Sequence, residues 1–127
     1  MKTISVIFWT AAIYGVLVLL VGLLGEAQFN EASPPAITHP EFYYGFHGLA
    51  LVLQIVFAII ARDPLRYRLL IPVAILEKAA FFIPCLLLWH ADRLDNSSSI
   101  FVGGMIDGIF MLLFGYAWFA SKRPQQQ

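Results

Sequence analysis

The chain has 127 residues, enough for one domain, and 60% of them are hydrophobic while only 13% are charged; the mean hydropathy is +0.77. This composition lies outside the range of soluble globular domains and indicates an integral membrane protein, with the lipid bilayer as its surroundings. Eight basic and eight acidic residues give a formal net charge of zero, which argues against a nucleic-acid partner.

Four apolar stretches are each long enough to cross a bilayer, which takes about 20 helical residues for a hydrocarbon core about 30 Å thick. We predict an all-α, four-helix transmembrane bundle that forms a single membrane domain over residues 1–127. The predicted helices run from Ile4 to Leu24, from Tyr43 to Ala61, from Tyr67 to Trp89 and from Ser98 to Ala120. An alternative makes the first segment a cleaved signal peptide, but its apolar run exceeds the roughly 7 to 15 residues typical of such peptides.

Residues 25–42 form the longest connection between the predicted helices. Its stretch from Ser33 to Pro40 contains several prolines, which favour an extended and stiff backbone. We predict that this loop lies on the outer side of the membrane. There it either covers the mouth of the bundle or only joins two helices.

Lysine and arginine gather on one side of the predicted bundle. Short connections rich in these residues stay in the cytoplasm, so both termini are predicted to be cytoplasmic. The residues concerned are Lys2, Arg62, Arg66, Arg68, Lys122 and Arg123. The opposite side is acidic and has Arg93 as its one lysine or arginine.

Three ionisable residues lie near the middle of the predicted spans. Glu77 and Lys78 are about 16 Å from either end of the third helix at 1.5 Å per residue, and Asp107 has a similar depth in the fourth. Ionised groups are unfavourable in hydrocarbon, so such residues are functional candidates by default. We predict that Lys78 pairs with Asp107. With Glu77 the cluster carries net negative charge, which a proton or a cationic ligand would neutralise; the alternative is a structural ion pair that sets helix register.

Small residues and prolines accompany this cluster. Glycines at regular spacing are predicted to let neighbouring helices approach closely. They are Gly15 and Gly22 in the first helix and Gly104, Gly108 and Gly115 in the fourth. Pro72 and Pro84 lie on either side of Glu77 and are predicted to bend the third helix, because each removes a backbone hydrogen bond.

The second helix carries a polar stripe formed by Tyr44, His47 and Gln54, which is predicted to face the bundle interior and to join the candidate site. A weaker alternative uses His47 and His90 as ligands of a haem or metal ion between the second and third helices. The sequence lacks phosphate-binding loops and hydrolase motifs, so no cofactor and no catalytic residue are predicted.

Three segments resemble a group of small, uncharacterised bacterial four-helix membrane proteins. They are Pro35 to Phe46, Asp63 to Arg68 and Leu76 to Lys78, and the resemblance extends over nearly the whole chain. It implies a multi-pass protein of the bacterial inner membrane and brings no activity, cofactor or catalytic residue. A looser likeness to DoxX-like four-helix proteins rests on helix number and length.

Three classes of function are compatible with this sequence. The favoured one is a binding protein or an enzyme for a lipophilic or cationic small molecule, which Glu77, Lys78 and Asp107 would hold. A proton-coupled carrier would titrate one of the acids, and four helices would then form a homo-oligomer to enclose a pathway. A non-catalytic subunit of a membrane assembly would use its helix faces alone.

Overall fold

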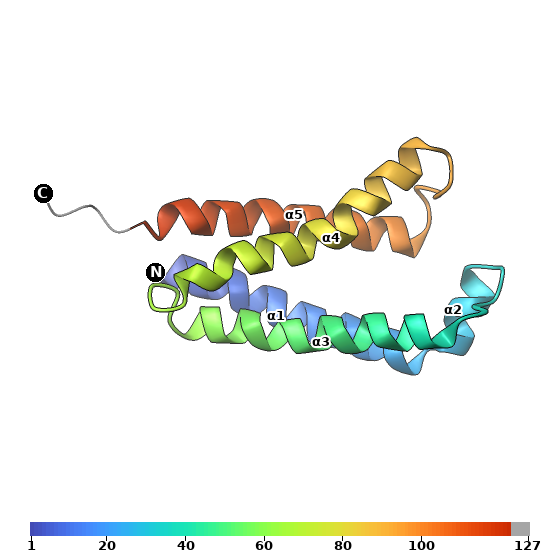
Figure 1. The fold of residues 1–127 in the computed structure, drawn as a ribbon, viewed down its shortest axis with the longest axis horizontal. Coiled ribbons are helices and arrows are strands. Elements are labelled where there is room, and N and C mark those ends of the chain that lie inside the picture. The colour runs from blue at the N-terminus through green and yellow to red at the C-terminus, as the bar shows by residue number, and fades with distance from the viewer. Residues whose placement is uncertain (123–127) are drawn as a thin grey trace, which may run out of the picture.

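The computed structural model describes residues 1–122 of the chain, and this part consists of helices and turns (Figure 1). The elements are α1 (Lys2–Leu24), α2 (Glu26–Ala32), α3 (Pro40–Arg62), a 3-10 turn η1 (Arg68–Leu70), α4 (Ile71–His90) and α5 (Ser99–Ala120). Four segments are long and apolar enough to cross a membrane: α1, α3, η1 with α4, and α5. The prediction of an all-α bundle with four spans is confirmed, and the chain is a multi-pass membrane protein.

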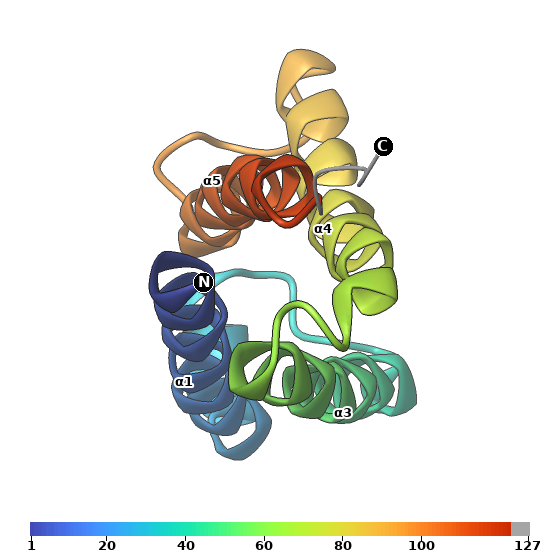
Figure 2. The ribbon, with the colours of Figure 1, turned by 90° about the vertical axis from the view of Figure 1, so that its left-hand side faces the viewer.

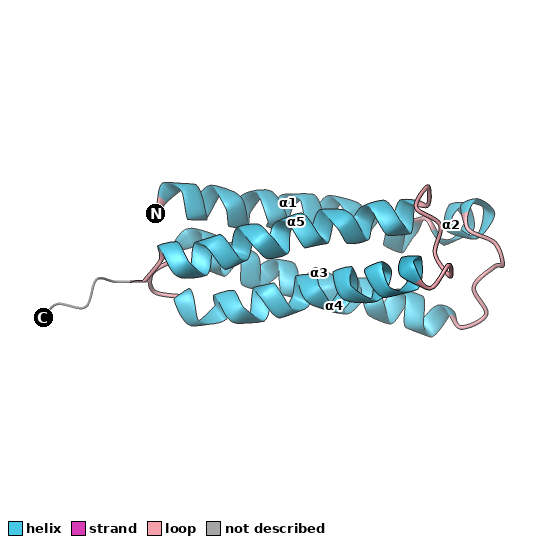
Figure 3. Ribbon diagram, turned by 90° about the horizontal axis from the view of Figure 1, so that it is seen from above, coloured by secondary structure: helices cyan, strands magenta, loops and turns pink. Residues whose placement is uncertain are grey.

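The connection between α1 and α3 differs from the predicted loop. It contains the short helix α2, whose residues Glu26, Ala27 and Gln28 favour helix, and only Gly25 and residues 33–39 are non-helical. In addition, α3 begins at Pro40, because proline fits the first turn of a helix, where its missing N–H has no partner to lose. Figure 3 shows α2 beyond the ends of the long helices.

The start of α4 also differs from the prediction. The chain forms η1 before α4 begins at Ile71, so Pro72 lies in the first helical turn and removes no intrahelical hydrogen bond. The predicted bend at Pro72 is therefore wrong. Pro84 does lie inside the helix, and α4 leans away from α3 toward its C-terminal end (Figure 1).

The two ends of the bundle differ in charge. One end, the basic end, holds the start of α1, the turn from α3 to α4 and the end of α5, with Lys2, Arg62, Arg66, Arg68 and Lys122. Arg123, which belongs to the same predicted set, lies outside the described residues. The opposite end, the acidic end, holds α2 and the connection between α4 and α5. The charge sorting expected from the sequence therefore corresponds to the two ends of the folded bundle.

The four long helices form two pairs, α1 with α3 and α4 with α5, and the pairs contact one another much less extensively than their members do (Figure 2). Glycine permits the close approach within each pair. A Cβ atom at Gly104 would lie 2.7 Å from the Cys85 side chain, and one at Gly108 would lie 2.7 Å from the Phe82 ring. The predicted close contacts of Gly104 and Gly108 are confirmed, and Gly15 and Gly22 of α1 have the same role against α3. The prediction for Gly115 is wrong, because a Cβ atom there would meet nothing within 4 Å.

The hydrophobic core lies in the half of the bundle nearer the basic end, where the two pairs meet. Phe8 of α1 stacks on Phe114 of α5 with ring centroids 4.3 Å apart, and Phe57 of α3 packs against both. The buried core residues are Ile4, Phe8, Ala11, Ala12, Phe57, Ile60, Ala61, Ile71, Ala74, Phe110, Phe114 and Ala117. Several of them come from α1, the segment that the signal-peptide alternative would remove, so α1 is part of the described core.

Polar contacts at the basic end reinforce this junction. Arg68 of η1 donates hydrogen bonds to the Trp118 carbonyl and the Ser121 hydroxyl, each 3.1 Å long, and its guanidinium lies 3.5 Å from the centre of the Trp118 ring. Arg68 therefore connects the start of α4 to the end of α5. Between the other two helices, the Ser5 hydroxyl donates a hydrogen bond to the Ala61 carbonyl.

Candidate functional site

The candidate site lies directly beside the core, one helical turn toward the acidic end. At this level the inward-facing position of each long helix is polar or glycine. These positions are Gly15 on α1, Gln54 on α3, Lys78 on α4 and Asp107 on α5. Each follows or precedes a core residue of its own helix by one turn, so the regular helical spacing that builds the core also gathers this polar layer.

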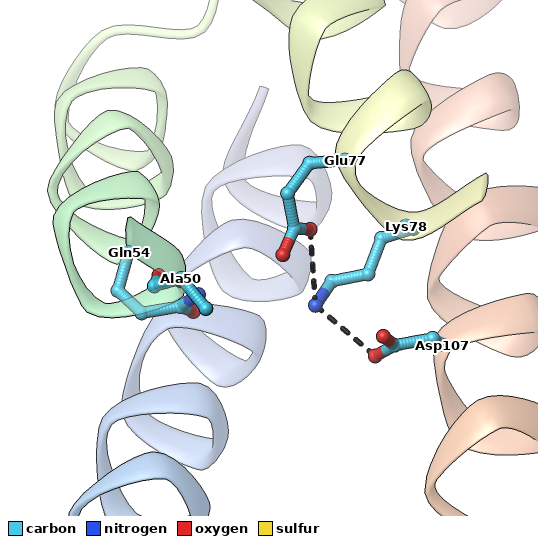
Figure 4. A network of polar contacts seen from close by, with 5 residues as sticks. All are labelled: Ala50, Gln54, Glu77, Lys78 and Asp107. Carbon is cyan, nitrogen blue, oxygen red and sulfur yellow. Dashed lines mark hydrogen bonds and ion pairs between the residues drawn. The ribbon is translucent and has the colours of Figure 1, made fainter. Parts of the chain in front are cut away.

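Lys78 is the centre of the layer (Figure 4). Its Nζ donates a hydrogen bond of 3.1 Å to Oδ1 of Asp107 and lies 3.2 Å from Oε2 of Glu77. The structure thus contains the predicted Lys78–Asp107 pair. Glu77 joins the same cation although it neighbours Lys78 in sequence, because the long lysine side chain extends past the helix surface to lie between the two acids.

The cluster exposes its acids more than its cation. The Lys78 side chain is 5% accessible, compared with 13% for Glu77 and 15% for Asp107. Moreover, Oε2 of Glu77 is shielded and is not aligned for a hydrogen bond with Lys78. Two carboxyl groups therefore share one lysine, and both acidic side chains are somewhat more accessible than the lysine.

Gln54 contributes a further acceptor without a partner. It is only 2% exposed, its amide nitrogen donates a 2.8 Å hydrogen bond to the Ala50 carbonyl, and its Oε1 has no hydrogen-bond partner. A Cβ atom at Gly15 would lie 2.0 Å from that oxygen, so only glycine permits this position of the amide. The predicted inward position of Gln54 is confirmed.

Aromatic rings separate the cluster from the basic end. The Lys78 Nζ lies 5.2 Å from the centre of the Phe57 ring and 5.9 Å from that of Phe110, distances at which the faces of aromatic rings attract a cation. Tyr14 of α1 packs against Phe110 with centroids 5.7 Å apart. These three aromatic residues were not predicted as neighbours of the charges. The available signal was spacing, because Phe57 follows Gln54 and Phe110 follows Asp107 by about one helical turn.

The remaining candidates lie elsewhere. Tyr44 is exposed rather than directed inward, and its hydroxyl donates a 2.6 Å hydrogen bond to Glu26 of α2, so its predicted interior position is wrong. His47 lies between α1 and α3, with Nδ1 2.7 Å from the Tyr43 carbonyl and Nε2 against Gly22. His90 is exposed at the end of α4.

A metal site receives no support from this arrangement. Among residues 1–122 no group of three or more histidine, cysteine, aspartate or glutamate side chains is placed to hold a metal ion. No contact joins His47 to His90 in the same part of the chain, and both acids near Lys78 already face that cation. Ligation by the two histidines stays an untested alternative.

A cavity opens between the helix pairs at the acidic end. It has a volume of about 570 Å³ and is bounded by the end of α1, by α2, by the start of α3 and by Ser99 at the start of α5. Its lining is mainly apolar, with Val21, Leu24, Phe29 and Tyr43. On the other side of the bundle the Phe46 ring of α3 packs against Phe81 of α4, with centroids 5.6 Å apart.

Comparisons of the chain with protein-family models, with curated protein sequences and with solved structures give no match. The resemblance to small bacterial four-helix proteins stays a prediction. The cluster of Glu77, Lys78 and Asp107 and its surroundings are therefore the basis of the proposed function.

Proposed function

We propose that the protein binds a lipophilic cation, of the alkylammonium class, through the acids of the Glu77–Lys78–Asp107 cluster. The observation that carries the proposal is that two carboxyl groups share one buried lysine and keep more accessible surface than it does. With all three groups ionised the cluster has a charge of −1. A net charge is unfavourable in a membrane interior, and a bound cation neutralises it.

Hydrogen bonding favours a cation with N–H groups. Carboxylate oxygens only accept hydrogen bonds, and Oε2 of Glu77 and Oε1 of Gln54 both lack donors. A primary ammonium group supplies three donors in addition to its charge. A quaternary ammonium group has the same charge and no donor. Comparing the binding of the two groups therefore separates the contribution of hydrogen bonding from that of charge.

Apolar surroundings favour a lipophilic ligand. Phe57 and Phe110 lie beside the charges, and the cavity at the acidic end is lined mainly by apolar residues. Ligand sites commonly combine an apolar lining with a few polar groups that fix orientation. We propose that the ligand reaches the cluster from the acidic end or from the surrounding lipid.

Binding is favoured over transport because of the packed core. The Phe8 and Phe114 stack, with Phe57 against it, fills the bundle between the cluster and the basic end. In this conformation these rings block passage from the cluster to the basic end. A carrier would require a second conformation in which these rings separate.

Native mass spectrometry of the protein in mild detergent tests the proposal, with dodecylamine, dodecyltrimethylammonium and dodecanol as probes. Wild-type protein should retain dodecylamine best. Glu77→Gln should lower its retention about 10- to 100-fold, the effect of losing one charge-assisted hydrogen bond of about 1.5–3 kcal/mol. Glu41→Gln is the matched control, because it makes the same change at the exposed acidic end.

The same spectra decide between the functional classes. Equal and weak retention of all three probes in wild type and Glu77→Gln would refute ligand binding and favour a structural ion pair. A mass corresponding to several copies of the chain, unchanged by Glu77→Gln or Asp107→Asn, would favour the assembly role.

We also propose that the basic end faces the cytoplasm of a bacterial cell and that the protein lies in the inner membrane. The proposal is supported by the gathering of lysine and arginine at that end. Cys85 is the single native cysteine, so a Cys85→Ser background allows single cysteines to be placed at Leu65 and Asn96. In intact spheroplasts an impermeant maleimide should label the Asn96→Cys variant and not the Leu65→Cys variant; the reverse would overturn the orientation.

A further inference from the structure

A second cavity lies at the basic end, separate from the Glu77–Lys78–Asp107 cluster. It has a volume of about 350 Å³ and occupies the turn between α3 and η1. Its lining residues are Ile59, Arg62, Asp63, Arg66 and Tyr67. Two of these five residues are arginines, and they come from the last position of α3 and from the turn that follows it.

The guanidinium groups of Arg62 and Arg66 are free of carboxylate partners. Within the described part of the chain, neither is within salt-bridge distance of an acid, although Asp63 lies between them in sequence. The Asp63 carboxylate instead accepts a 3.0 Å hydrogen bond from the Arg66 backbone N–H. Arg68 behaves differently, because its guanidinium is fully engaged with α5.

The charges around the cavity favour an anion. Arg62 and Arg66 contribute +2 and Asp63 contributes −1, so the lining has a charge of +1. The C-terminus of α3 opposes an anion with about half a negative charge, which is smaller than the charge of one arginine and is screened at this exposed turn. The lining of the cavity therefore keeps a positive balance.

We infer that this cavity binds a phosphate group, with the phosphodiester of an anionic membrane lipid as its natural source. Guanidinium groups bind phosphate through paired N–H donors, and two of them line this cavity. Arg62 ends a membrane span, so it lies at the depth of lipid headgroups, and Ile59 lies almost one turn deeper, at the edge of the hydrocarbon. The inference does not depend on the proposed ligand of the midplane cluster.

The test measures lipid retained by the full-length protein in native mass spectra. Phosphatidylglycerol and phosphatidylcholine with identical acyl chains are added separately, and inorganic phosphate is added in competition. We expect phosphatidylglycerol to be retained at least tenfold better than phosphatidylcholine. At about tenfold per 1.4 kcal/mol and about 1 kcal/mol per arginine, Arg66→Gln should weaken its retention about fivefold and the double variant Arg62→Gln/Arg66→Gln about 30-fold.

Lys2→Gln is the matched control, because it removes one positive charge from the same end without changing the cavity lining. It should leave retention within about twofold of wild type, whereas Arg66→Gln should not. All three residues are exposed, so each variant should keep its helices. Circular dichroism of each variant checks this.

Two results would overturn the inference. Equal retention of the two lipids would show that an anionic headgroup is not selected, because phosphatidylcholine has the same phosphodiester with a compensating cation; equal losses in Lys2→Gln and Arg66→Gln would show a diffuse attraction to the basic end. If millimolar inorganic phosphate displaces phosphatidylglycerol, the cavity is a phosphate site for which free phosphate is a sufficient ligand. If phosphate does not change the retention of phosphatidylglycerol but the double variant Arg62→Gln/Arg66→Gln loses it, the cavity binds the lipid and not free phosphate.

Discussion

Replacing Lys78 with methionine separates the cost of burying the cluster from the benefit of its pairing. Methionine keeps most of the alkyl chain, so packing is largely preserved while the positive charge is removed. The lost interactions are a charge-assisted hydrogen bond to Asp107, about 1.5–3 kcal/mol, and weak attraction to two aromatic rings, about 0.5–2 kcal/mol. Two mostly buried acids would then be left without their cation, and removing one partner of a buried pair costs about 3–5 kcal/mol.

We therefore expect Lys78→Met to lower the free energy of unfolding by about 3–5 kcal/mol, measured by titrating mixed micelles with sodium dodecyl sulfate and following helix content. Adding Glu77→Gln and Asp107→Asn to the same chain should restore at least half of that loss, because no uncompensated charge remains. Lys2→Met, an exposed change of the same type, should have no measurable effect. A loss below about 1 kcal/mol in Lys78→Met, or a triple variant less stable than the single one, would refute the reasoning.

Three further predictions concern other parts of the molecule. Gly108→Leu should destabilise the α4–α5 pair by about 1–3 kcal/mol in the same titration, because a Cβ there meets a phenylalanine ring at 2.7 Å, whereas Gly115→Leu, facing open space, should have a much smaller effect. Arg68→Gln should cost about 1–3 kcal/mol through its lost hydrogen bonds and ring contact; a stability equal to wild type would contradict its role in joining η1 to α5. Hydrogen bonds from the Ser97 amide and hydroxyl lower the pKa of Asp95, so this turn should be stabilised above the ordinary pKa of an aspartate and lose that stabilisation as pH falls through the lowered value. The amide NMR shift of Ser97 should titrate with a midpoint below the ordinary pKa of an aspartate. A midpoint at or above the ordinary value would show that the hydrogen bonds from Ser97 do not lower the pKa of Asp95.

The sequence predicted the spans and the central ion pair because both follow from the cost of polar groups in hydrocarbon. A span of about 20 apolar residues is recognisable without any tertiary information. A lysine in the middle of a span requires a partner, and Asp107 was the acid at matching depth on another helix. Lys78 and Asp107 could therefore be found from the sequence, whereas the contact between their side chains depends on the tertiary structure.

The arrangement of the helices could not be predicted in the same way. In a soluble protein the polar face of a helix points to water, but α1 is apolar on all sides, so no pattern marks the face that packs against α3. Gly15 was recognised as a small residue, yet its contact with Gln54 depends on how α1 and α3 are aligned. Short elements such as α2 and η1 have too few residues for a periodic signal.

The division of the bundle into two pairs that join at the basic end has a mechanical consequence. The aromatic core joins the two pairs, so the separation of their halves toward the acidic end depends on the tilt of the helices. Helix tilt responds to bilayer thickness at a cost of fractions of a kcal/mol per Å of mismatch. The thickness of the surrounding membrane would thus change the separation of the two helix pairs at the acidic end. That separation in turn determines how accessible the polar layer of Gln54, Lys78 and Asp107 is.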